Sequence, residues 1–185
     1  MELRDPFFYR LHELAQEHDD IVVVSADMWA MGLDPFKRDF PERCVDVGIA
    51  EQTMVNVAAG LALEGKRPFC VAIASFAVYR CFEQIKLNMS DMRLPITIVG
   101  IGPGLSYAWD GPSHHCLYDV SLFSVLPGID IWDPLTEVQA AEAALVTYGR
   151  RNPAYVRLRK GFMPERYGQY DDPSWEWWRD TLDVA

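Results

Sequence analysis

One acidic residue stands at the start of an otherwise nearly uncharged segment. Glu51 lies in the stretch Asp46-Val47-Gly48-Ile49-Ala50-Glu51-Gln52 and precedes a run of small and apolar residues. The pattern predicts a helix over 49–63 that is terminated by Gly65. A carboxylate at this position can cap free backbone N–H groups and interact with the helix dipole. In a dry pocket the same group can also share a proton with a ligand.

A second stretch combines aromatic residues at a regular spacing. Phe76, Tyr79 and Phe82 recur every three residues, just before and within the predicted helix over 79–88. This spacing favours one shared helix face. Such a stripe is usually part of a hydrophobic core. It can also form a pocket that stacks on a planar ring, because aromatic faces bury area without requiring polar partners.

A third stretch is a loop with acid–base side chains. Asp110 is followed by Gly, Pro and Ser and then by two adjacent histidines, His114 and His115. Loops of this composition are often surface turns. Two histidines close to an aspartate can also hold hydroxyl groups and transfer protons at neutral pH.

Hydrophobic periodicity predicts the elements that must position these side chains. The predicted helices are 5–18, 49–63, 79–88, 117–126 and 137–148, and the predicted strands are 21–24, 44–47, 68–74, 95–99, 130–132 and 155–158. This alternation indicates an α/β fold, a three-layer parallel sheet with helices on both faces. Ligands of such sheets bind beyond the carboxyl ends of the strands. These ends lead into the loops 25–31, 48–51, 75–79, 102–115 and 157–160.

Composition limits the classes of partner. The formal net charge of −10 argues against binding to nucleic acid or to an anionic membrane surface. No apolar stretch approaches the roughly 20 residues needed to span a bilayer, and the first residues do not resemble a signal peptide. The four cysteines contain no CxxC pair, which favours reduced thiols and a cytoplasmic location.

Taken together, these stretches resemble a known family. Gly48-Ile49-Ala50-Glu51-Gln52, the segment Ser75–Phe82 and Asp110-Gly111-Pro112-Ser113-His114 occur in the order and spacing of the pyrimidine-binding domain of transketolases. Ser25-Ala26-Asp27 after the first strand and Arg4, 23 residues before Asp27, also fit. The resemblance extends from about Arg4 to Gly161 and includes deoxyxylulose-phosphate synthases.

The resemblance implies a cofactor and roles for several side chains. Thiamine diphosphate would lie between this domain and a separate pyrophosphate-binding chain, which holds the diphosphate and Mg²⁺. Since the sequence has no Gly-Asp-Gly stretch, we expect it to bind the aminopyrimidine end and no metal itself. Glu51 would be the catalytic residue that hydrogen-bonds the pyrimidine ring. The other cofactor-binding residues would be Asp27, Phe76, Tyr79 and Phe82.

The resemblance also assigns substrate-binding residues. Asp110 and His114 would hold sugar hydroxyls and assist proton transfer. The remaining substrate-binding positions would be Arg4, His115, Arg157 and Lys160.

The sequence departs from the family where the acceptor's phosphate is bound. Transketolases use two Arg, a Ser and a His for this purpose, and only Arg4 is retained. The other three positions hold Met31, Gly102 and Lys160. In addition, Tyr107-Ala108-Trp109 brings bulk to a stretch that is Gly-rich in relatives. We therefore expect an acceptor that is not an ordinary pentose phosphate, and that lacks phosphate or is carried on another group.

The chain length bears on domains and partners. We expect a pyrimidine-binding domain over 1–162 and a C-terminal arm over 163–185, with three Trp packed on the domain or on a partner. Because the family's third domain does not follow, the chain would be one subunit of a split enzyme or a fragment. The partner would be the N-terminal pyrophosphate-binding subunit in an α2β2 assembly that transfers a two-carbon ketol unit from a ketose donor.

Three alternatives stay open at this point. Within the cofactor class, the chain could serve a deoxyxylulose-phosphate synthase-like enzyme or the β-type subunit of a 2-oxo acid dehydrogenase, although the Asp110–His114 stretch favours a transketolase. A non-catalytic regulatory subunit is the alternative from another class, and the joint presence of Glu51, Asp110 and His114 argues against it. The third alternative is a dinucleotide-binding domain, and the absence of a GxGxxG signature after the first predicted strand argues against it.

Overall fold

Six parallel strands form the centre of the protein in the computed structural model, which describes residues 2–160. The strands are β1 (Ile21–Ser25), β2 (Cys44–Asp46), β3 (Arg67–Ile73), β4 (Thr97–Ile101), β5 (Asp130–Trp132) and β6 (Ala154–Leu158). Their order in the sheet is β2-β1-β3-β4-β6-β5, and every neighbouring pair is parallel. The carboxyl ends of all strands therefore meet at one edge, as the sequence predicts.

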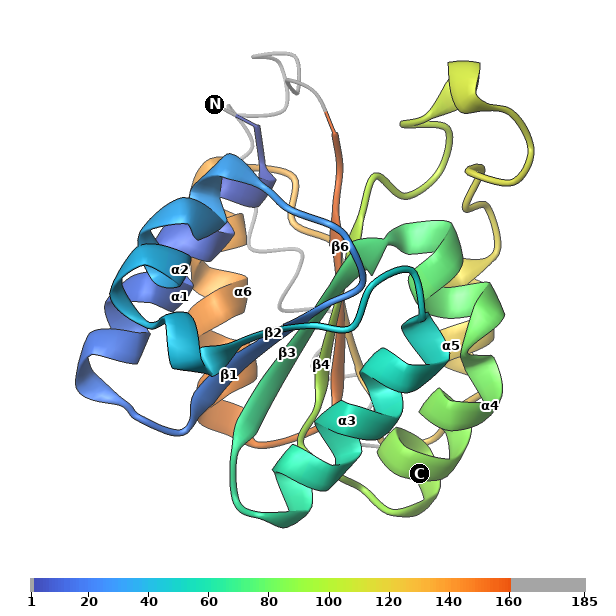
Figure 1. Ribbon diagram of the computed structural model, residues 1–185. Helices are drawn as coiled ribbons and strands as arrows, with labels where there is room; N and C mark the ends of the chain where they lie inside the picture. Colours follow the sequence, from blue (N-terminus) through green and yellow to red (C-terminus); the bar gives the residue numbers. More distant parts are fainter. Residues whose placement is uncertain (1, 161–185) are drawn as a thin grey trace.

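Helices cover both faces of the sheet (Figure 1). One layer consists of α1 (Arg4–Glu17), α2 (Asp34–Asp39) and α6 (Glu137–Arg150), and the other of α3 (Glu51–Leu63), α4 (Phe82–Ile85) and α5 (Asp119–Ser124). Each layer closes its own apolar core against the sheet. Because both faces are covered, β1 and β4 are buried along their whole length, which explains their β-branched composition. The predicted three-layer α/β fold is confirmed.

The largest difference from the predicted elements follows β3. The single helix predicted over 79–88 is wrong, because the chain forms a π-helix at Phe76–Arg80, the short α4, and a second π-helix at Lys86–Asp91. Cys81 separates the first two pieces with a non-helical backbone. A π-helix closes hydrogen bonds five residues apart, so side chains spaced by three do not share a face as they do in an α-helix.

Smaller differences concern element ends and one helix. The helix α2 is absent from the predicted elements, α5 is shorter than the predicted 117–126, and β4 begins two residues later than predicted. In the described part of the chain, no helix has both the length and the apolarity to cross a membrane. The predicted arm over 163–185 and its packing lie outside the described residues.

Candidate active site

Glu51 lies at the carboxyl edge of the sheet, in the first turn of α3. The turn that leads from β2 into this helix passes through Gly48, whose backbone has a positive φ of 71°. No side-chain cap precedes the helix, and Glu51 is its only acidic residue in the first turn. The carboxylate is nevertheless buried, with 2% of the residue exposed. A buried carboxylate needs a partner.

That partner is Arg80, a residue that the sequence reasoning did not single out. Its Nη1 donates a hydrogen bond of 2.6 Å to Oε2 of Glu51. The guanidinium also lies over the ring of Phe76, 4.4 Å from its centroid. Because the π-helix carries both Phe76 and Arg80, it brings an aromatic face and a cation to the buried carboxylate. The sequence signal that could have pointed to Arg80 is its position as a basic residue inside the aromatic stretch Ser75–Phe82.

His114 joins this cluster from the loop before α5. Its ring meets Phe76 edge-on at 5.0 Å between centroids, and Ser113 Oγ lies 3.1 Å from Nδ1. Contact with Ser113 occupies one ring nitrogen, so Nε2 is the nitrogen able to meet a substrate hydroxyl. The structure thus brings together Glu51, Phe76 and His114, which the sequence reasoning placed in one site.

The other two aromatic residues of the stretch have partners of their own. Tyr79 accepts a hydrogen bond of 2.9 Å from the backbone N–H of Tyr118, and the two rings lie 6.4 Å apart. Burial and the nearby Cys116 raise the pKa of the Tyr79 hydroxyl. Phe82 packs against the core beneath α3. Tyr79 lies in the same π-helix as Phe76, and Phe82 begins α4, so their role in cofactor binding stays a prediction.

Asp27 and Asp46 form a second, smaller arrangement at the same edge. One oxygen of Asp46 accepts hydrogen bonds from the backbone N–H groups of Asp27, at 3.1 Å, and Gly48, at 2.9 Å. Asp27 has a positive φ of 50°, an uncommon conformation for an aspartate. Asp46 therefore ties the loop after β1 to the turn that precedes Glu51.

Asp110 and His115 differ in how far they are engaged. Asp110 lies in the one-turn helix η5 (Ala108–Asp110) with an exposed side chain. His115 Nε2 lies 3.2 Å from the carbonyl oxygen of Ala108, so the ring fastens the loop to itself. Of the two, Asp110 has the more accessible side chain for contact with a substrate.

The predicted substrate-binding cations all have internal partners. Arg4 pairs with Glu2 at 2.6 Å, and the Nζ of Lys160 lies 4.4 Å from the centroid of the Tyr107 ring. Arg157 binds Asp119 through Nε at 2.7 Å and Asp133 through Nη1 at 2.7 Å. Burial alone would lower the pKa of Arg157, but these carboxylates outweigh it and raise that pKa.

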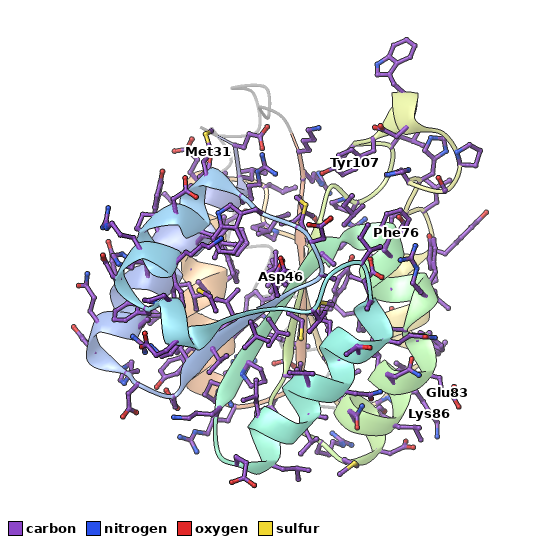
Figure 2. The ribbon with its side chains drawn as sticks, in the orientation of Figure 1. Met31, Asp46, Phe76, Glu83, Lys86 and Tyr107 are labelled. Carbon is purple, nitrogen blue, oxygen red and sulfur yellow. The ribbon has the colours of Figure 1, made fainter. Side chains whose placement is uncertain are left out.

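Tyr107 stands between several of these residues. Its ring lies 6.0 Å from that of His114, and Figure 2 shows Tyr107 and Phe76 in the upper right part of the molecule and Asp46 nearer the centre of the view. Burial raises the pKa of the Tyr107 hydroxyl; the charges of Glu2 and Asp110 act in the same direction and that of Arg4 acts against them.

The comparisons with known proteins bear on this edge of the sheet. The family described as "Transketolase, pyrimidine binding domain" matches residues 1–165, which include every side chain described above. The chain belongs to the transketolase family. Transketolases are thiamine diphosphate-dependent transferases, so the predicted family resemblance is confirmed.

Two similar relatives are named as transketolase subunits. The chain is 36% identical over 157 residues to the 6-deoxy-6-sulfo-D-fructose transketolase subunit SqwH of Clostridium sp. (strain MSTE9), covering 84% of this chain and 49% of the relative. It is 33% identical over 169 residues to one of the apulose-4-phosphate transketolase subunits of Phocaeicola vulgatus, covering 91% and 54%. The chain thus spans about half the length of the curated relatives it matches.

A solved structure shares both fold and sequence. It is described as a split gene transketolase, an inactive beta4 tetramer, and superposes with a TM-score of 0.78 at 33% identity. The superposition covers 89% of this chain and 53% of that chain.

The residues present fit the pyrimidine end of the transketolase cofactor. Glu51 offers a buried carboxylate, Phe76 an aromatic face, and the buried Ser75 an Oγ that has no hydrogen-bond partner among the described residues. Carboxylate, ring face and hydroxyl are the groups that a polar heteroaromatic ring requires. Within residues 2–160, no group of three or more His, Cys, Asp or Glu residues is arranged to hold a metal ion.

A separate cleft lies at the opposite edge of the sheet. It has a volume of about 610 Å³, and its cation, Arg43, donates to the carbonyl oxygens of Ala15 and His18 and stacks on Phe40. Because these bonds cap the carboxyl end of α1, the cleft belongs to the helix terminus and not to the active-site cluster.

Proposed function

We propose that this chain is the pyrimidine-binding subunit of a two-chain transketolase-like enzyme. The enzyme transfers a two-carbon ketol unit from a ketose donor to an aldehyde acceptor. The observation that carries the proposal is the buried Glu51 carboxylate at the start of α3, with Arg80, Phe76 and His114 gathered at the same edge.

The partner chain supplies what this chain does not carry. We infer that an N-terminal pyrophosphate-binding subunit holds the diphosphate and Mg²⁺, in an α2β2 assembly with active sites between the chains. This inference is supported by the missing Gly-Asp-Gly stretch and by the relatives' being named as subunits. The four free cysteines favour the cytoplasm, and the donor class favours carbohydrate metabolism.

Thiamine diphosphate, when bound, supplies a nucleophilic carbon that can carry the ketol unit. With the cofactor bound, Glu51 would hold or release a proton at its carboxylate oxygen toward the pyrimidine end. To do so, the carboxylate exchanges its bond from Arg80 for one to the ring. Arg80 is 41% exposed and lies on an aromatic face, so its guanidinium has room to stay near the site after this exchange.

The remaining side chains orient the substrate. His114 presents Nε2 to a hydroxyl or to a developing alkoxide, since Ser113 engages Nδ1. The carboxylate of Asp110 accepts a hydrogen bond from a neighbouring sugar hydroxyl. Phe76 excludes water on one side of His114 and keeps its ring upright through the edge-on contact. Asp27 contacts the cofactor, and the hydrogen bond to Asp46 holds the loop that carries Asp27.

The proposal is tested by reconstitution. The neighbouring-gene candidate for the pyrophosphate-binding chain is co-purified with this chain, and thiamine diphosphate with Mg²⁺ is titrated calorimetrically into the pair and into each chain alone. We expect binding by the pair only. Glu51→Gln lowers the rate of ketol transfer by about 10²- to 10⁴-fold, the usual size of a lost acid–base group.

A matched variant controls for loss of a glutamate. Glu83 is exposed in α4 and lies away from the active-site end of the molecule (Figure 2), so Glu83→Gln leaves the rate unchanged. Failure of the pair to bind the cofactor would favour a non-catalytic subunit. Oxidative decarboxylation of a 2-oxo acid, or release of deoxyxylulose phosphate, would favour one of the two related enzyme classes.

A further inference from the structure

The ring of Tyr107 lies beside Gly102 and Lys160, two positions that the family resemblance assigns to the acceptor's phosphate. Gly102 follows β4 with a positive φ of 69°, and a Cβ built on it would lie 2.2 Å from Cε2 of Tyr107. A side chain at position 102 would therefore require the Tyr107 ring to move from its present place. The phenol ring of Tyr107, from the following loop, occupies the volume that a side chain at Gly102 would take.

The same ring also engages a cation. Lys160 Nζ lies 4.4 Å from the Tyr107 ring centroid, close enough for a cation–π contact. The ring of His114 is also near Tyr107, at 6.0 Å between ring centroids. Tyr107 thus contacts both the proposed proton-transfer residue and the cation Lys160.

The neighbouring guanidinium groups are neutralised by carboxylates. Arg4 pairs with Glu2, Arg157 with Asp119 and Asp133, and Arg159 also with Asp133 at 2.6 Å. A phosphate dianion attracts guanidinium groups that can donate to it directly. Here it would compete with carboxylates for these N–H groups, and Asp119, which is 1% exposed, would be left with the Tyr155 hydroxyl as its donor.

We propose that Tyr107 is a specificity-determining residue that selects an uncharged polyhydroxy aldehyde as acceptor and excludes its phosphate ester. The proposal rests on the proposed function, because it names the acceptor class of the same site. The aromatic face of Tyr107 packs against the C–H groups of such an aldehyde, and its hydroxyl offers one hydrogen bond. Neither contact attracts a dianion.

The test compares two acceptors that differ only in phosphate. The reconstituted two-chain enzyme is given hydroxypyruvate as ketol donor and either D-glyceraldehyde or D-glyceraldehyde 3-phosphate, and kcat/KM is measured for each. We expect D-glyceraldehyde to be preferred at least tenfold. Tyr107→Ala shifts this ratio about tenfold toward the phosphate ester, because it removes the ring beneath Lys160 and above Gly102.

Two further variants locate the effect. Tyr107→Phe keeps the ring and therefore keeps most of the preference. Trp109→Ala removes a fully exposed ring from the same loop and leaves the ratio unchanged, which controls for a general disturbance of the loop. Calorimetric binding of thiamine diphosphate is measured for each variant and stays as in the unmodified pair.

The two levels of the proposal fail in different ways. If the pair binds the cofactor, three results would each overturn the role of Tyr107. They are a preference for the phosphate ester, an unchanged ratio in Tyr107→Ala, and no transfer to either acceptor. Absence of cofactor binding by the pair would instead overturn the proposed function.

Discussion

The buried carboxylate of Glu51 accepts a hydrogen bond of 2.6 Å from the half-exposed guanidinium of Arg80. The two residues come from different elements, α3 and the π-helix after β3, and lie 29 positions apart. Their pairing keeps a negative charge satisfied inside the protein. In the proposed reaction, the same charge must be released to the cofactor.

Removal of Arg80 is expected to destabilise the isolated chain. Arg80→Ala leaves the Glu51 carboxylate without its charged donor, which costs about 1–3 kcal/mol for a buried group. Because the guanidinium is 41% exposed, water replaces part of the bond and we expect the lower half of that range. Urea unfolding of the isolated chain measures the loss.

A double-mutant cycle separates this pair from general effects. With Glu51→Gln in place, Arg80→Ala should cost clearly less, since no buried charge is left unpaired. Equal costs of Arg80→Ala in the two backgrounds would show that Arg80 acts through its packing on Phe76 and not through Glu51.

Asp46 is expected to matter for cofactor binding more than for stability. Asp46→Ala removes the acceptor shared by the N–H groups of Asp27 and Gly48, and so frees the two loops that flank the proposed pyrimidine site. We expect the affinity of the reconstituted pair for thiamine diphosphate to fall about tenfold, which corresponds to one or two lost hydrogen bonds. Asp91→Ala, an exposed change at the far end of the second π-helix, leaves it unchanged.

Much of this arrangement could be predicted from local sequence. The β-branched strands and the order of the loops at the carboxyl edge depend on neighbouring residues, and both predictions agree with the structure. The π-helix at Phe76–Arg80 could not be predicted from a spacing of three, because its wider turn depends on packing against the sheet.

Long-range pairing was the other limit. Arg157 reads as a free cation at the end of a strand, yet its partners Asp119 and Asp133 lie 38 and 24 positions away. Likewise, Tyr107 reads only as added bulk, since nothing in the sequence shows that its ring fills the space above Gly102. Such contacts depend on the closed sheet and are visible only in three dimensions.

The four cysteines are expected to react slowly in the folded chain. Burial raises the pKa of Cys44 to about 11 and those of Cys81 and Cys116 to about 12, and it raises the pKa of Cys70 strongly. Since the thiolate is the reactive form, at pH 8 only about one thiol in a thousand or fewer is available. Titration with a chromogenic disulfide should therefore be at least about 100-fold slower than in denaturant, where four thiols react. The rate should rise with pH up to about pH 11; a thiol that reacts rapidly at pH 8 in the native chain would contradict these pKa shifts.

Two glycine substitutions are expected to change stability in opposite directions. A Cβ at Gly100 would lie 2.9 Å from the ring of Tyr155 and 3.2 Å from Cβ of Ala74. Tyr155 cannot easily yield, because it is fully buried, stacks on Phe123 at 4.2 Å and donates a hydrogen bond to Asp119. Gly100→Ala should therefore cost about 1–3 kcal/mol through overpacking.

Gly60 provides the matched substitution. It lies in the middle of α3 with no atom within 4 Å of a built Cβ, so Gly60→Ala adds helix propensity without a clash and should stabilise by up to about 1 kcal/mol. Urea midpoints at a constant m value measure both changes. If Gly100→Ala were neutral, the core around Tyr155 would have to be looser than its contacts with Phe123 and Asp119 indicate. The stability changes of Gly100→Ala and Gly60→Ala would then no longer distinguish a tightly packed position from an open one.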